Sequence, residues 1–317
     1  MPKLKTENPT KQLFGYQVDK ENSEVFFNDE KHLYLDKLTG EPYISVTTLL
    51  HSYEPPFNEF FYSRYKALEE LADPDHFSLV KSGLIATQIW KPELVEKLKV
   101  NQEEFDAKVQ EILDRWHSTR DESCIWGTQV HELMENSFYG QTHFDLSNYG
   151  CPNINGDYKC VAGYYPKKLE PGIYPEYLVS WVSPEGLRIS GQIDCLICDN
   201  DLTINVLDWK TNKEIKKRGY YNSVKKKNAS LLYPVSNLES CNWNIYQLQV
   251  SMYAYMLKQL NPEVTIGDLN IVHIDRSGKQ TIHPCKYLEA EVEKIIHHYA
   301  KSLKTKELLD KNKPVII

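Results

Sequence analysis

The densest hydrophobic pattern in the chain is a series of three apolar segments between residues 175 and 207. Each segment is rich in β-branched and aromatic residues, which are typical of strands, and turn-forming polar residues separate them. The segments are residues 175–182, 187–198 and 202–207. Because successive strands joined by short turns pair with each other, this pattern predicts an antiparallel meander of three strands.

Elsewhere apolar residues recur every three or four positions, which is the spacing of one face of a helix. Helices are therefore expected at residues 57–72, about 92–117, 122–138, 243–260 and 287 to about 308. Residues 25–27 and 32–35 predict a β-hairpin, and residues 268–275 predict a further strand. The Ser and Thr residues around Ser45 predict the cap of a helix that begins near Val46.

Together these elements predict an α/β protein with a mixed β-sheet, in which the antiparallel meander and a further strand are flanked by helices. Residues 1–120 are expected to form an N-terminal β-hairpin and a mainly helical extension that pack on the core. The core is expected at residues 121–317, with an irregular insertion at about 140–173, where Gly, Asn, Pro and Tyr are frequent.

The composition indicates an intracellular protein that is not bound to a membrane. No apolar run approaches the roughly 20 residues that cross a bilayer, and the first residues lack the apolar segment of a secretion signal. The seven scattered cysteines favour reduced thiols over a disulfide framework, so we expect a cytoplasmic location. The formal net charge of −7 argues against a basic coat, but an acidic protein can still carry a basic groove for nucleic acid.

The stretch Asp208-Trp209-Lys210 places a carboxylate and an ammonium group at the end of an apolar strand. Residues two apart on a strand project from the same face, so Asp208 and Lys210 point together while Trp209 points away. An ion pair at the end of a strand is the ordinary explanation of this arrangement. Burial of two charges is costly, however, and such costs are concentrated at functional sites.

The register of the meander decides which other acid joins this pair. If the second turn has three residues, Cys198 lies opposite Leu202. Asp194 then lies opposite Val206 and shares a face with Asp208, whereas a turn of two residues would place it on the other face. We expect the turn of odd length.

A histidine, a further acid and two residues of a later helix complete the candidates. His131 follows Gly127 by one helical turn, which would permit close packing, but a lone helical histidine is more often a surface or core residue. Glu176 lies near the start of the meander. Gln249 and Tyr253 lie one turn apart on an amphipathic helix, which packing alone would explain.

Basic residues follow the lysine-bearing strand. They are Lys213, Lys216, Lys217, Arg218, Lys225, Lys226 and Lys227, with Tyr220 and Tyr221 between them. A solvated loop is the ordinary explanation of a charge run. Aromatic residues among cations nevertheless favour contact with nucleic acid, because cations pair with phosphates and rings stack on bases.

The order of these residues resembles that of a known family. It is Gly127-x-x-x-His131, Glu176, Gly191-x-x-Asp194, Asp208-x-Lys210 and Gln249-x-x-x-Tyr253, on a helix, three strands and a helix. This order resembles the PD-(D/E)XK nuclease superfamily, and within it the RecB-like exonuclease group, which includes phage-type nucleases and the mitochondrial genome maintenance exonuclease. The resemblance covers about residues 122–275. It implies a restriction-endonuclease-like core.

The resemblance also implies a metal-dependent phosphodiesterase. His131, Asp194 and Asp208 would ligate the ion. The carbonyl of Trp209 would be a further oxygen ligand, and Glu176 would complete the acidic cluster. Carboxylates suit Mg2+ or Mn2+, and an imidazole ligand favours Mn2+.

The remaining residues would act on the substrate. Lys210 would orient or deprotonate the attacking water and stabilise the developing charge. Gln249 and Tyr253 would position the substrate or hold the lysine-bearing strand. The basic residues expected to bind substrate are Lys213, Lys216, Lys217 and Arg218.

These features lead us to expect a DNA exonuclease that acts on single strands or duplex ends in replication, repair or recombination, with a phage-encoded enzyme among the options. Two alternatives stay open, namely an endonuclease that uses the same site and a non-catalytic nucleic-acid-binding subunit on a nuclease-derived fold. The sequence has no phosphate-loop motif, so a helicase or recombination partner would be a separate chain. Only Cys285 follows the second motif helix, so we expect no iron–sulfur cluster of the kind found in some members.

Overall fold

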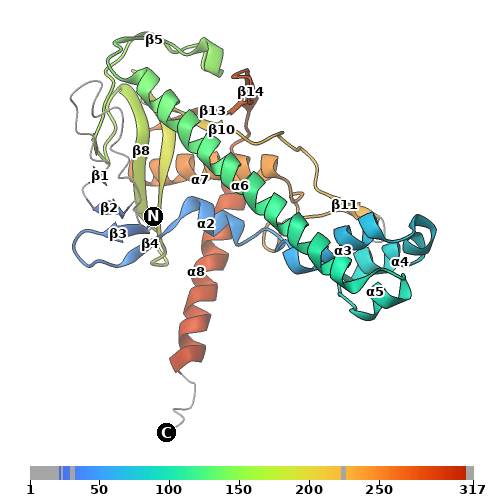
Figure 1. Ribbon diagram of the computed structural model, residues 1–317. Coiled ribbons are helices and arrows are strands. Elements are labelled where there is room, and N and C mark those ends of the chain that lie inside the picture. The colour runs from blue at the N-terminus through green and yellow to red at the C-terminus, as the bar shows by residue number, and fades with distance from the viewer. Residues whose placement is uncertain (1–20, 23, 29–32, 223–225, 312–317) are drawn as a thin grey trace. The chain divides into compact units, whose positions relative to one another are not determined.

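The computed structural model describes residues 21–22, 24–28, 33–222 and 226–311, and its fold is mixed α/β (Figure 1). The chain divides into two compact units. The sheet unit comprises Met1–Glu54, Gln129–Gly219 and Ser230–Ile317, and the helical unit comprises Pro55–Thr128 and Tyr220–Ala229. This division differs from the expected boundary near residue 120, because the N-terminal strands belong with the sheet and residue 120 lies inside a continuous helix.

In the described part of the chain, ten strands form one mixed sheet in the sheet unit. Its order is β14-β13-β10-β9-β4-β3-β2-β1-β7, and β8 pairs with β9. The strands are β1 Glu21–Asn22, β2 Val25–Asn28, β3 Leu33–Asp36, β4 Pro42–Ser45, β7 Tyr164–Tyr165, β8 Gly172–Val182, β9 Arg188–Cys198, β10 Thr203–Lys210, β13 Thr265–Ile274 and β14 Gln280–Pro284.

The predicted meander and hairpin are both confirmed. Strands β8, β9 and β10 pair antiparallel in succession, β13 adds parallel to β10, and β2 pairs antiparallel with β3. His32, at the expected start of the second hairpin strand, lies outside the described residues. The expected irregular insertion contains only short elements: β5 His143–Asp145, the 3-10 helix η1 Ser147–Tyr149, β6 Asn155–Asp157 and β7.

The turn between β9 and β10 has a different length from the one we expected. Cys198 lies opposite Ile204, not Leu202, so the ladder is displaced by two residues. Leu202 has a backbone φ of 62° and belongs to the turn, and Thr203, the first residue of β10, pairs with β13, so the ladder with β9 begins only at Ile204. A displacement of two residues keeps every side chain on its expected face.

Two helices of the sheet unit pack on its core, α7 Asn242–Leu260 and α8 Glu289–Lys311. The short helix α2 Val46–His51 begins where we expected, because the Ser45 hydroxyl accepts from the Thr48 amide at 3.0 Å. Asp208 and Trp209 project from opposite faces of β10. Asp208 accepts from Gln249 of α7, and Trp209 stacks on Phe138 at the end of α6, so α7 and this last turn cover opposite faces.

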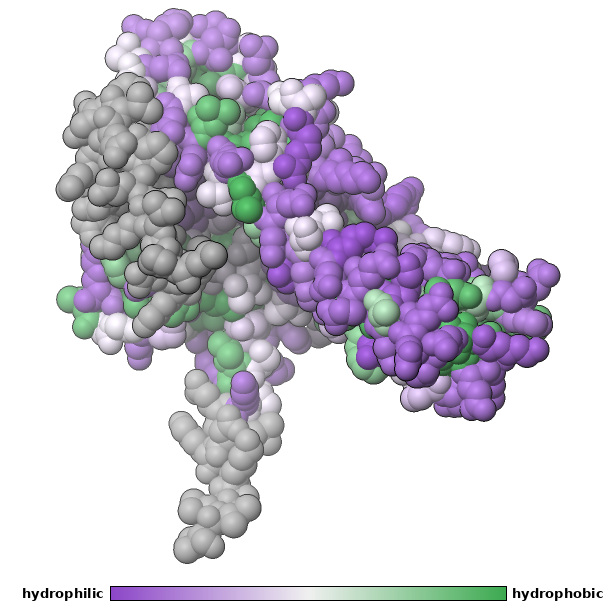
Figure 2. Space-filling model, in the orientation of Figure 1, coloured by the Kyte–Doolittle hydropathy of each residue, from purple (hydrophilic) through white to green (hydrophobic). Residues whose placement is uncertain are grey.

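The helical unit has a core of its own, in which Phe61, Leu68 and Ile112 are fully buried. Its helices are α3 Glu59–Leu71, α4 Pro74–Thr87, α5 Glu93–Lys97 and the first part of α6 Gln102–Phe138. Two short strands, β11 Tyr221–Asn222 and β12 Lys227–Asn228, also belong to this unit. The face in Figure 2 is mainly hydrophilic, with apolar residues at scattered positions.

The two helices expected at about 92–117 and 122–138 are placed differently in the structure. Lys99 has a φ of 56° and Asn101 caps the Glu104 amide, so α5 ends at Lys97, before this break, and α6 begins at Gln102, after it. Residues 118–121, polar but without Gly or Pro, do not interrupt α6, and the Thr119 hydroxyl donates to the Arg115 carbonyl one turn earlier. Among the described residues, no helix is both long and apolar enough to cross a membrane.

Gly191 is required where α7 approaches the sheet. A Cβ atom at this position would lie 2.8 Å from Tyr253 Cε1 and 3.3 Å from Val46 Cγ2, and both neighbours are buried. We expect Gly191→Ala to lower the free energy of unfolding by about 1–3 kcal/mol, as overpacking does. Chemical denaturation measures this. Gly83→Ala is the matched control, because Gly83 lies in α4 with open space around it and should gain up to about 1 kcal/mol. Equal stability of the two variants would contradict the close approach.

Candidate metal centre

The site lies where β9 separates from β10. Strand β9 pairs with β10 up to Cys195–Leu207, and with β4 at Ile189 and Ser190 on the same edge. Between these two ladders, β9 has no further ladder partner on this edge within the described chain. The Asp194 carboxylate fills this opening, where its Oδ2 accepts from the Trp209 amide at 2.6 Å. A side chain thus replaces the missing strand partner and fixes Asp194 at the end of the ladder.

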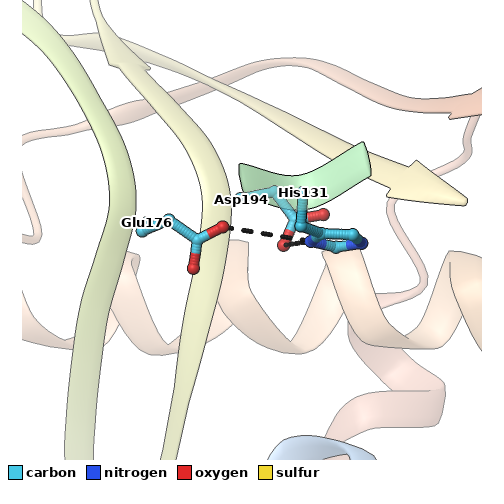
Figure 3. Close-up of side chains that lie close together, drawn as sticks. All are labelled: His131, Glu176 and Asp194. Atoms are coloured by element: carbon cyan, nitrogen blue, oxygen red, sulfur yellow. Dashed lines mark ion pairs between the residues drawn. The ribbon is translucent and has the colours of Figure 1, made fainter. Parts of the chain in front are cut away.

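Three side chains from three elements converge at this opening (Figure 3). His131 of α6 has its Nδ1 3.4 Å from Asp194 Oδ1 and 3.9 Å from Glu176 Oε1 of β8. The ligand atoms of the three residues lie within 4.8 Å of one another. The His131 side chain is 34% exposed, whereas the two carboxylates are nearly buried. The cluster is therefore reached from the side of the histidine.

Glu176 holds an unusual backbone conformation within this cluster. Its φ is 51°, in the middle of an eleven-residue strand, although the pairing on either side of it continues without a shift. A positive φ is costly for a residue with a Cβ atom and is concentrated at functional sites. The strain falls on the residue that supplies one of the carboxylates.

A second group of buried polar side chains adjoins the cluster. Asp208 is fully buried, and its Oδ2 lies 2.6 Å from Lys210 Nζ. Gln249 Nε2 donates to the other oxygen of Asp208 at 3.0 Å and also contacts the Tyr253 hydroxyl at 3.2 Å. Gln249 thus ties α7 to the lysine-bearing strand, which is one of the two roles the resemblance implied for it.

The structure brings together a set that differs from the implied ligands in one member. Glu176 lies with His131 and Asp194, whereas Asp208 lies against Lys210 and outside the cluster. The backbone of Trp209 adjoins the cluster through its amide, which donates to Asp194.

The charges of the two groups are coupled. Burial lowers the pKa of His131, but the Asp194 and Glu176 carboxylates outweigh it and raise that pKa to about 11. Burial raises the pKa of Asp194, but His131 and Lys210 hold it below its usual value. Burial raises the pKa of Asp208 to about 6, partly offset by Lys210. Burial lowers the pKa of Lys210, but the two aspartates raise it overall, so the lysine stays charged.

Two of the three separations within the cluster are compatible with a divalent cation. Ligand atoms about 2.1 Å from one octahedral ion lie about 3.0 Å apart when adjacent and about 4.2 Å apart when opposite. The distances of 3.4 and 3.9 Å from His131 Nδ1 to the two carboxylates fall within that interval. Two carboxylates and an imidazole suit Mg2+ or Mn2+, and an ion would replace the positive charge that the protonated imidazole now supplies.

The basic residues expected to bind substrate lie on the segment after β10, outside the cluster. Lys213 is exposed, Lys216 pairs with Glu214 at 3.2 Å and Arg218 pairs with Glu239 at 2.9 Å. The Lys217 ammonium lies 4.9 Å from the centre of the Trp243 ring.

The sequence-based candidates did not include Tyr246, over whose ring Lys210 Nζ lies at 4.8 Å. Tyr246 is three residues before Gln249, so helical spacing alone could have suggested it. Cys195 and Cys198 of β9 are both buried free thiols.

Comparison with known proteins does not assign a function to this chain. No family model and no curated protein matches the chain. One similar solved structure, described as the crystal structure of SSO0001, has a TM-score of 0.35 and 12% identity over 82% of this chain and 75% of that chain. Similarity at this level carries no argument about function, which must come from the geometry and chemistry of the residues.

The positive φ of Glu176 can be tested by stability alone. Glu176→Gly and Glu176→Ala both remove the carboxylate, but only glycine tolerates a φ of 51°. We expect the glycine variant to be more stable than the alanine variant by about 1–2 kcal/mol in chemical denaturation. Val182, half-exposed at the end of the same strand, is the control position. There the Val182→Ala variant should be more stable than Val182→Gly by about 0.5–1 kcal/mol. The same order at both positions would contradict the strained backbone.

The raised pKa of His131 predicts how stability depends on pH without metal. A pKa raised on folding contributes stability that is complete below the unfolded value of 6.5 and is lost as pH rises toward about 11. In EDTA, the stability advantage of the wild type over His131→Gln should shrink between about pH 6 and about pH 9. Mn2+ should reverse this trend, because a ligating imidazole must be neutral. An advantage that grows with pH in EDTA would contradict the cluster.

Proposed function

We propose that this protein is a Mg2+- or Mn2+-dependent nuclease that hydrolyses DNA phosphodiester bonds. The observation that carries the proposal is the convergence of His131, Glu176 and Asp194 beside a buried Asp208–Lys210 pair. A cluster of metal-ligand type explains the acids, but a structural metal site has no use for a charged lysine next to it. Phosphodiester hydrolysis uses both.

The order of elements supports a PD-(D/E)XK core of the RecB-like type. Helix α6 is followed by the antiparallel strands β8, β9 and β10, then by α7, and then by β13 parallel to β10. The residues of the motif lie on these elements in the order that the resemblance requires. We propose a restriction-endonuclease-like fold on this basis.

Each residue has a distinct part in the proposed reaction. Glu176, Asp194 and His131 would hold the ion, which when bound polarises the scissile phosphate and lowers the pKa of water. Lys210 brings a fixed positive charge to the phosphate and orients the attacking water. Asp208 keeps that ammonium charged and in place, at 2.6 Å. Gln249 in turn holds Asp208, so it acts as a positioning residue.

We propose that the substrate is single-stranded DNA or a duplex end, cleaved as an exonuclease. The basic segment that follows β10, with Lys213, Lys216, Lys217 and Arg218, supports an anionic polymer as substrate. Metal-bound acids and basic surface are separate in the chain, so a net charge of −7 is compatible with this partner.

The test is incubation of the purified chain with linear and circular DNA, single- and double-stranded, with Mg2+, Mn2+ or EDTA. We expect divalent-dependent degradation of linear substrates and survival of circles. Asp194→Asn and Lys210→Gln should each lower the rate at least about 100-fold, because each removes transition-state or ligand charge. Lys301→Ala, an exposed lysine on α8, is the matched control and should cleave at the wild-type rate.

The outcomes separate the alternatives. Cleavage of circles would replace the exonuclease with an endonuclease at the same site. DNA binding without cleavage under any divalent condition would leave a non-catalytic nucleic-acid-binding subunit. Cleavage that persists in Asp194→Asn and Lys210→Gln would reject the site as its source.

A further inference from the structure

The carboxyl-terminal ends of β10 and β13 bring a lysine and a histidine together. The two strands are parallel, and Lys210 pairs with His273 in their ladder. His283 of β14 lies opposite Ile271, two residues before His273, so both histidines project from the same face as Lys210. Figure 1 shows β10, β13 and β14 as neighbours, and Trp243 near the start of α7 contacts His283 of β14.

Four half-buried rings extend from this point, and we call them the aromatic strip: Tyr246, His273, His283 and Trp243. Its first contacts run through Asn212. The Tyr246 hydroxyl donates to the Asn212 side chain, and His273 Nε2 donates to the Asn212 carbonyl at 2.6 Å. The His273 and His283 rings are 6.3 Å apart, and His283 lies 5.8 Å from Trp243.

A cation lies at each end of the aromatic strip. Lys210 Nζ is 4.8 Å from the Tyr246 ring, and Lys217 Nζ is 4.9 Å from the Trp243 ring. The segment that bears Lys217 is fixed to the start of α7. The Lys216 amide donates to Asn242 Oδ1 at 2.8 Å, and the Trp243 amide donates to the Lys216 carbonyl at 3.3 Å. Lys217 is therefore held beside the rings, although its side chain is exposed.

The acids around the aromatic strip are already compensated. Glu214 pairs with Lys216, Glu54 pairs with His51, and Asp275 accepts from the amides of its own turn. An anionic ligand that reaches the strip thus meets the ammonium of Lys217 and no uncompensated carboxylate from these residues. Rings that alternate with cations are what an unpaired nucleotide strand recognises, because its bases expose their faces and its phosphates carry charge.

We propose that the aromatic strip binds single-stranded DNA that extends from the metal centre, with bases against Trp243 and His283 and a phosphate at Lys217. This inference rests on the proposed nuclease function in one respect, namely that the end of the DNA strand lies at Lys210. A duplex keeps its bases stacked on one another, so it cannot use the ring faces, and the strip should discriminate between the two forms.

Binding of labelled oligonucleotides in EDTA tests the aromatic strip separately from catalysis. We expect Trp243→Ala to weaken binding of a single strand about 5- to 150-fold, with little change for the duplex of the same sequence. Trp243→Phe keeps a ring and should retain most of the affinity, which distinguishes stacking from misfolding. Thermal unfolding of each variant confirms that it is folded.

The salt dependence separates the phosphate contact from the stacking contact. Lys217→Ala should reduce the slope of log affinity against log salt by about 0.7, the value for one phosphate of a single strand. Trp243→Ala should leave that slope unchanged, as should the control Lys301→Ala. With Mn2+, Trp243→Ala should raise KM for a linear single strand and leave kcat close to the wild-type value.

The failures of the two proposals are distinguishable. Wild-type single-strand affinity in both Trp243→Ala and Lys217→Ala would overturn the aromatic strip, even if the enzyme cleaves DNA. Equal losses for single strand and duplex would overturn it as well. If the wild type cleaves nothing while the two variants lose single-strand affinity, the strip stands and the nuclease proposal falls.

Discussion

The fully buried carboxylate of Asp208 is the constraint on which the arrangement of this site depends. A carboxylate in the interior requires charged or hydrogen-bonding partners. Without them, the buried charge lowers the stability of the fold by roughly several kcal/mol, even after relaxation. Lys210 supplies the charge at 2.6 Å, and Gln249 supplies a hydrogen bond at 3.0 Å. These contacts hold the end of β10 against α7. Removal of any one of them would leave a buried polar group without compensation.

Strand β9 separates from β10 at this same end of β10, and the cluster forms at the opening between the two strands. Asp194 occupies the opening and takes the Trp209 amide, so its second oxygen can face His131. Glu176 reaches the same point only through a left-handed backbone conformation. Strain in one strand and a gap in the next are unfavourable for the fold alone. They are understandable if the convergence of ligands is what selection has maintained.

Periodicity predicted those parts of the structure that depend on local sequence. The alternation of the meander gave its three strands, and the Ser45 cap gave the start of α2. The predicted length of the turn before β10 was wrong by two residues. Leu202 adopts a positive φ, which an apolar side chain does not indicate in the sequence. Which side chains converge at the cluster could be predicted only in part, because the choice between Glu176 and Asp208 depends on the opening between strands. The contact of Lys210 with a ring of α7 is likewise tertiary.

We propose, as the main conclusion, that Glu176, Asp194 and His131 form a divalent metal site beside the charged Lys210. Anomalous diffraction from crystals soaked in Mn2+ tests it most directly. We expect a single strong peak within about 2.5 Å of His131, Glu176 and Asp194, and its loss in Asp194→Asn. A peak found only at exposed acids elsewhere, or no peak at the cluster, would contradict the account.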